Sequence, residues 1–226
     1  MKVLIAFVAL LSAACGPSVP SDPKLAGKAY FTQAGCASCH RVGGEGSAVG
    51  PDLTLVGFRH SEEWLNRFIK DPQAWKKDTL MPNKRMSDEA VRAISSYLAE
   101  QKGQAWTAGK PWDSAKAEEK GRVIYARAGC VGCHGVGGAG GYPNNNVKGG
   151  LIPRLNAAWE TYTKPELVAK IKKGVPMSEK ADPKGESPLI RMPTWSEKLS
   201  DDEIGAVADY LMTLRPGKGE SSDSSF

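Results

Sequence analysis

The residues with the most distinctive chemistry form two copies of one pentapeptide, Cys36–His40 and Cys130–His134. Each copy has two cysteines separated by two residues and a histidine directly after the second cysteine. This spacing is typical of c-type haem attachment, in which both sulfurs form thioethers with the porphyrin and the histidine binds the iron. A thioredoxin-like redox pair or half of a zinc site would explain the cysteines, but not the histidine after each pair.

The sequence therefore predicts two covalently bound haem c groups. The predicted attachment and proximal residues are Cys36, Cys39, His40, Cys130, Cys133 and His134. These motifs use four of the five cysteines and two of the three histidines, so no disulfide framework is expected.

Length and composition are consistent with this prediction. The 226 residues suggest one or two domains, and the 41% hydrophobic fraction is low unless a haem supplies part of each core. The formal net charge is only +5, and the propionates of two haems would reduce it further. A nucleic-acid partner is therefore not expected.

The first residues predict export. A basic start at Lys2 precedes the apolar run Val3–Leu11 and the small residues Ser12–Ala14, so residues 1–14 read as a signal peptide too short to span a membrane. The segment Leu11–Cys15 resembles a bacterial lipobox. Lipidation of Cys15 would then anchor the mature protein to a membrane through more than one acyl chain.

In this interpretation residues 15–21 are a lipidated tether, and residues 216–226 are a polar, disordered C-terminal segment. The expected location is the periplasmic or outer face of a membrane. The alternative is ordinary cleavage near Ala14, which would leave an exposed reactive thiol on an exported protein.

Helices must position the haem residues. The predicted helices occur in the same order in each half of the chain, as an internal repeat. A helix from Pro23 to about Ala34 precedes the first motif, and a helix over Ala115–Ala128 precedes the second. Each carries a glycine four residues before an aromatic residue: Gly27 with Phe31, and Gly121 with Tyr125.

Each half continues with a proline loop, an amphipathic helix, a Met-Pro pair and a last helix containing Tyr-Leu. In the first half these features are Pro51, Glu62–Lys70, Met81 and the helix after Ser87. In the second half they are Pro153, Pro165–Lys173, Met192 and the helix after Ser200. The predicted helix caps are Ser61, Ser87, Thr163 and Ser200, with capping boxes to Glu166 and Glu203.

This order of features resembles a tandem of class I cytochrome c domains. The resemblance implies an all-α fold with two small helical domains, each wrapped around a covalent haem, at residues 22–101 and 114–215 with a linker at 102–113. It also implies that the first and last helices of each domain cross at Gly27 and at Gly121. The carbonyls of Pro51 and Pro153 would accept the second N–H of His40 and His134.

The resemblance makes the methionines of the two Met-Pro pairs, Met81 and Met192, the distal iron ligands. Met177 stays open as a substitute in the longer second half. His60 directly precedes the cap Ser61, so we expect it on the surface or beside a haem propionate. The extra residues of the second half, Gly135–Gly150 and Val175–Arg191, are interpreted as surface insertions, either solvated loops or a face for a partner.

An iron with both axial positions filled has no open site for a small-molecule substrate, so the expected chemistry is electron transfer rather than catalysis. The sequence predicts a dihaem carrier whose partners are redox proteins or a membrane respiratory complex. One alternative is a fixed cytochrome subunit of a membrane oxidase or reductase. Another is a dihaem peroxidase, which the Met-Pro pair in both halves disfavours.

Overall fold

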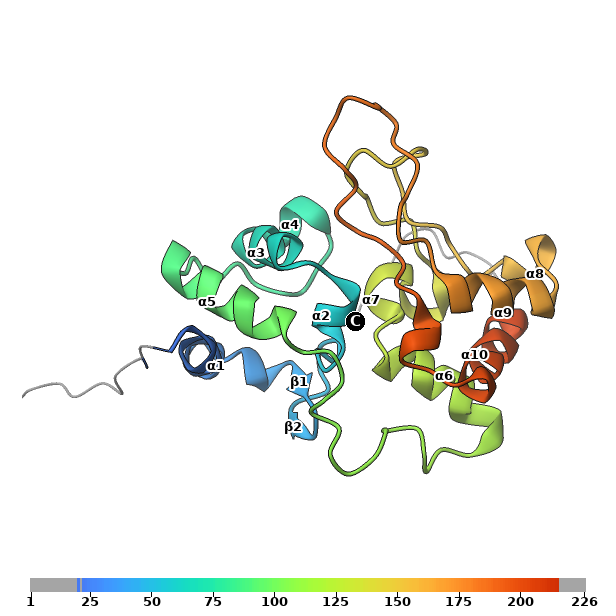
Figure 1. Cartoon of the computed structure of the whole chain (residues 1–226), viewed down its shortest axis with the longest axis horizontal. Coiled ribbons are helices and arrows are strands. Elements are labelled where there is room, and N and C mark those ends of the chain that lie inside the picture. Colours follow the sequence, from blue (N-terminus) through green and yellow to red (C-terminus); the bar gives the residue numbers. More distant parts are fainter. Residues whose placement is uncertain (1–19, 21, 216–226) are drawn as a thin grey trace, which may run out of the picture.

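The computed structural model describes residue 20 and residues 22–215. The predicted signal peptide, the lipidation site Cys15 and the C-terminal segment 216–226 lie outside the described residues. Two groups of helices lie side by side, α1 to α5 in one and α6 to α10 in the other (Figure 1). In the part of the chain that is described, no helix has the length and apolar character needed to cross a membrane.

The first domain contains five α-helices among its described residues. They are α1 (Pro23–Gln33), α2 (Val56–Arg59), α3 (Glu62–Lys70), α4 (Pro72–Trp75) and α5 (Asp88–Ala99). The first haem motif lies on a 3₁₀ turn, η1 (Cys36–Ser38), followed by a short antiparallel pair, β1 (Arg41–Val42) and β2 (Glu45–Gly46). In this pair Arg41 lies opposite Gly46 and Val42 lies opposite Glu45.

The second domain repeats this plan. Its elements are α6 (Ala117–Arg127), α7 (Val131–His134), η2 (Val136–Gly138), α8 (Ala158–Thr161), α9 (Lys164–Lys173), η3 (Trp195–Glu197) and α10 (Asp201–Thr213). The second haem motif therefore lies on a helical turn directly after α6, as the first does after α1. The predicted all-α class, with two tandem domains, is confirmed.

Local side-chain chemistry sets where the helices begin. The hydroxyl of Ser61 accepts the Trp64 N–H at 3.2 Å, and that of Ser87 accepts the Ala90 N–H at 3.2 Å. Capping boxes start α9 at Thr163 and α10 at Ser200, as predicted. The helix predicted from Ala115 begins two residues later, because the Ala115 N–H bonds back to the Trp112 carbonyl in a turn.

The first and last helices of each domain cross at a glycine, as the resemblance implied. A Cβ on Gly27 would strike the Ala93 carbonyl oxygen, and one on Gly121 would strike the Ala206 carbonyl oxygen. An aromatic pair lies near each crossing at similar geometry. The ring centroids are 5.7 Å apart for Phe31 and Tyr97, and 5.4 Å apart for Tyr125 and Tyr210.

The segment between the domains packs against the second one. Trp112 is fully buried, and its ring N–H donates to the carboxylate of Glu203 in the first turn of α10. The Lys110 ammonium lies 2.8 Å from the same carboxylate. Residues 102–113 are therefore fixed by a buried polar contact rather than by chain connectivity alone.

The two domains also share their apolar cores. Leu55 and Phe58 of the first domain pack into the core of the second, where Phe58 meets Trp195 edge-on at 5.4 Å between ring centroids. In return, Ile152 and Ile190 of the second domain pack into the core of the first. The two halves therefore form one packed unit.

The helix crossings give the first prediction. Gly121→Ala should lower the free energy of unfolding by about 1–3 kcal/mol, because its methyl group has no space against the α10 backbone. Gly205→Ala, on the crossing helix but with open space around its Cα, should be neutral or stabilising by up to about 1 kcal/mol. Denaturant unfolding of both variants makes the comparison, and equal destabilisation would contradict the close crossing.

Candidate functional site

Both haem motifs begin from a glycine in the left-handed region. Gly35 has φ 72° and Gly129 has φ 88°, which turns the chain out of the preceding helix and into the motif. A helical turn follows in each case, in which the His40 N–H donates to the Cys36 carbonyl and the His134 N–H donates to the Cys130 carbonyl, both at 2.9 Å. The local fold thus brings each histidine back over its first cysteine.

Each motif histidine is held by the predicted proline carbonyl. The Nδ1 atoms of His40 and His134 lie 2.9 Å and 3.0 Å from the carbonyl oxygens of Pro51 and Pro153. A carbonyl only accepts, so Nδ1 carries the proton and Nε2 keeps a lone pair for a metal. Burial lowers the pKa of both imidazoles, which favours the neutral form that binds iron.

The first site is a largely apolar cavity of about 300 Å³. Cys36, Cys39, His40 and Met81 all line it, so the structure brings the first motif and its predicted distal methionine to one space. Apolar side chains supply much of the remaining wall: Phe31, Leu53, Val56, Leu65, Ile94 and Leu98. The buried ring N–H of Trp64, also in the wall, has no partner among the described residues and could serve a haem carboxylate. These residues fit a covalently attached haem.

In the second site, Met192 and Cys130 are half-buried and pack against the core of the second domain. The Met192 carbonyl accepts the Val175 N–H at 2.8 Å, which fixes the backbone of the Met-Pro pair. Met177, the substitute left open by the sequence, is 89% exposed and does not lie in that core. The structure thus favours Met192 over Met177, while ligation itself stays a prediction.

His60 does not lie on the surface, so that part of the expectation was wrong, while a place beside a haem propionate stays a prediction. It is only 6% exposed, and its Nε2 lies 3.9 Å from the sulfur of Cys133 in the second haem motif. Its ring stacks on Trp64, with the ring centroids 3.7 Å apart. The contact with the second domain covers His60, and no pattern within the first half could reveal that contact.

A second group at the domain interface was missed by sequence reasoning. Arg59 is 4% exposed and donates to the Gly129 carbonyl at 3.1 Å, directly before the second motif. The buried carboxylate of Asp52, next to Pro51, pairs with Arg127 at 2.8 Å and accepts the Thr54 N–H. These contacts tie the proline loop of the first site to the segment that leads into the second site.

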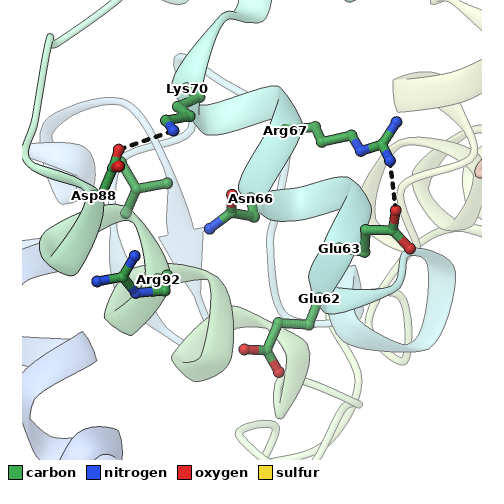
Figure 2. Close-up of a pocket in the computed structure, with 8 residues that line it drawn as sticks. Glu62, Glu63, Asn66, Arg67, Lys70, Asp88 and Arg92 are labelled. Atoms are coloured by element: carbon green, nitrogen blue, oxygen red, sulfur yellow. Dashed lines mark hydrogen bonds and ion pairs between the residues drawn. The ribbon is translucent and has the colours of Figure 1, made fainter.

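A surface depression also lies away from both haem motifs. It has a volume of about 440 Å³ and lies over α3 and α5. Its lining consists of Glu62, Glu63, Asn66, Arg67, Lys70, Asp88, Val91 and Arg92. Figure 2 shows two ion pairs here, Arg67 with Glu63 along α3 and Lys70 of α3 with Asp88 of α5, both at 2.8 Å. Solvent-exposed pairs of this kind form an ordinary charged surface rather than a site.

Comparison with known proteins agrees with this geometry. The family model described as cytochrome c matches twice, over residues 25–102 and 118–215. The chain belongs to the cytochrome c family. It therefore carries two covalently attached haem c groups, one per domain, of the kind that supports electron transfer in this family.

Two curated relatives are oxidase subunits. The chain is 37% identical over 81 residues to "Cytochrome c oxidase subunit 2" of Alkalihalophilus pseudofirmus, covering 32% of this chain and 24% of the relative. It is 25% identical over 214 residues to "Cbb3-type cytochrome c oxidase subunit CcoP" of an Azospirillum species, covering 85% of this chain and 62% of the relative. The chain thus spans less than two thirds of either relative. No solved structure matches.

The interface gives the second prediction. Asp52→Ala should lower the free energy of unfolding by about 2–3 kcal/mol, because it removes charge-assisted hydrogen bonds from a carboxylate that is 4% exposed. Glu63→Ala removes a pair of similar length whose side chains are 58% and 42% exposed, and should change stability little. Denaturant unfolding of both variants is the measurement. A Glu63 effect as large as the Asp52 effect would contradict the structural role of the interface.

Proposed function

We propose that this protein is an exported, membrane-anchored dihaem cytochrome that carries single electrons to a membrane-bound terminal oxidase. In this proposal His40 and Met81 ligate the first iron, and His134 and Met192 ligate the second. The observation that carries the proposal is the first cavity, where a proline-held imidazole and a methionine thioether line the same apolar space.

When bound, each haem supplies a one-electron couple. The chain's own residues restrict each haem to one-electron transfer by occupying the iron and excluding other ligands. Pro51 and Pro153 hold the imidazoles, Met81 and Met192 would supply the second protein ligand to each iron, and apolar side chains limit the access of water. A site filled in this way leaves no position for a substrate, which favours an electron carrier over a peroxidase.

The relatives support an oxidase as the partner, because the printed names of both describe oxidase subunits. The longer match covers 85% of this chain and so reaches into both domains. That match also favours a second candidate, a fixed subunit of such a complex. The predicted anchor at Cys15, followed by a short tether, favours a mobile carrier that stays at high effective concentration near its partner.

The ligand assignment gives the third prediction. Met81→Ala and Met192→Ala should each open one iron, so that each variant binds carbon monoxide at one of its two haems. The weak red charge-transfer band of methionine-ligated ferric haem should fall by about half in each variant. The optical spectrum of the ferric protein measures the band, and carbon monoxide titration of the reduced protein measures the opened haem.

Met177→Ala is the matched control, because Met177 is also a methionine of the second half but is 89% exposed. It should leave the band and the carbon monoxide response unchanged. If Met177→Ala opens a haem and Met192→Ala does not, the ligand of the second domain has been assigned wrongly.

The anchor gives the fourth prediction. Cys15→Ser should move the protein from the membrane fraction to the soluble periplasmic fraction without changing its visible spectrum, because residue 15 precedes both domains. Fractionation followed by haem staining measures this shift. Full retention of the variant in the membrane fraction would contradict lipid anchoring at Cys15.

The soluble Cys15→Ser protein then separates a carrier from a fixed subunit. Added in reduced form to oxidase-containing membranes that lack the native protein, a carrier should be oxidised under oxygen at a rate proportional to its concentration. A protein that works only as a fixed subunit should show no such oxidation, and should co-purify with the oxidase in detergent.

A further inference from the structure

The second domain contributes part of the wall around the first haem cavity. Tyr142, Pro143, Ile152 and Ile190 line the same space as Cys36, His40 and Met81. Ile152 and Ile190 are 8% and 9% exposed and belong to the apolar core of the first domain. Ile152 and Ile190 lie more than fifty positions after the end of the first domain in the sequence, yet they help to enclose its cavity.

Tyr142, Pro143 and Ile190 belong to the two insertions of the second domain, and Ile152 lies two residues after the first insertion. The two insertions pair with each other. We call residues 142–152 and 177–190 the insertion lobe. Figure 1 shows its two segments, yellow and orange, rising side by side above α7. Isolated β-bridges join Pro143 to Leu151 and Val147 to Lys180. The two insertions thus pair with each other and form one ordered unit.

Three consecutive asparagines hold the insertion lobe together. The Asn144 carboxamide donates to the Ile190 carbonyl at 2.9 Å and accepts the Ile190 N–H at 3.2 Å. Asn145 does the same with the Ser187 carbonyl, at 3.1 Å, and the Leu189 N–H, at 2.7 Å. Asn146 accepts the Asp182 N–H at 2.7 Å. A carboxamide carries a donor and an acceptor in peptide-like geometry, so each side chain replaces a missing strand partner.

Contacts across the domain boundary set the lobe against the first domain. The Lys76 ammonium lies 4.3 Å from the ring centroid of Tyr142, and Arg67 pairs with Glu186 at 3.2 Å. The Arg67 pair is exposed and contributes little. Burial of the apolar side chains of Ile152 and Ile190 is therefore the main attraction between the lobe and the first domain.

We propose that the insertion lobe is a functional wall of the first haem pocket, with Ile190 and Ile152 as positioning residues that exclude water and exogenous ligands from it. This inference rests on the proposed haem ligation. An apolar shell around a metal site controls solvent access and the affinity of competing ligands. Opening the wall should thus affect the first haem and leave the second haem unchanged.

The test uses the full-length ferric holoprotein and imidazole as a probe that competes with methionine for the iron. In a Met192→Ala background the second haem is already open and should bind imidazole tightly. The weaker of the two imidazole-binding phases then reports the first haem alone. Adding Ile190→Ser or Ile152→Ser should raise the imidazole affinity of that weak phase by about tenfold. Leu151→Ser, next to Ile152 but 53% exposed, is the control and should leave the phase unchanged.

A weak phase that is unaltered by Ile190→Ser, or that shifts equally in Leu151→Ser, would overturn the proposal. Should Ile190→Ser fail to accumulate, Asn145→Ala decides instead, because it loosens the lobe by removing only two hydrogen bonds. Failure of the underlying haem assignment is visible separately. It would appear as fewer than two haems, or as an open haem, in the protein without any substitution.

Discussion

The close crossing of the first and last helices at Gly27 and Gly121 is the contact on which each domain depends. Every helix among the described residues is short, the longest having 13 residues, so none of them is stable without packing. Joining the two ends of a domain fixes the loops between them, which carry the motif histidine, the proline and the methionine. A side chain at either glycine would separate the helices and loosen the whole loop at once.

The interface between the domains links the two haem sites directly. His60 lies in the wall of the first cavity and against Cys133 of the second motif, while Arg59 and Asp52 join the neighbouring backbone segments. The insertion lobe adds a wall from the second domain to the first cavity. These contacts make a pair of small domains behave as one unit, in which the environment of each site depends on both halves.

Features encoded within a few neighbouring residues could be predicted from the sequence. These include the haem motifs, the helix caps at Ser61 and Ser87, and the capping boxes. The proline contact to each histidine spans 11 and 19 residues and was implied by the family resemblance. The burial of His60 and Arg59 could not be predicted, because their partners lie about seventy residues away in the other domain. The three asparagines were visible as a run, but their bonds to the 182–190 segment depend on a pairing that has no periodic hydrophobic signal.

The chain holds two haems, and each iron is proposed to be ligated by one histidine and one methionine. Anaerobic redox titration of the purified protein, followed by optical spectroscopy, tests it most directly. The account predicts two one-electron transitions per chain, with the methionine charge-transfer band present in the oxidised protein at the intensity of two haems and lost on reduction. A single transition per chain, or one ferric haem without that band, would contradict it.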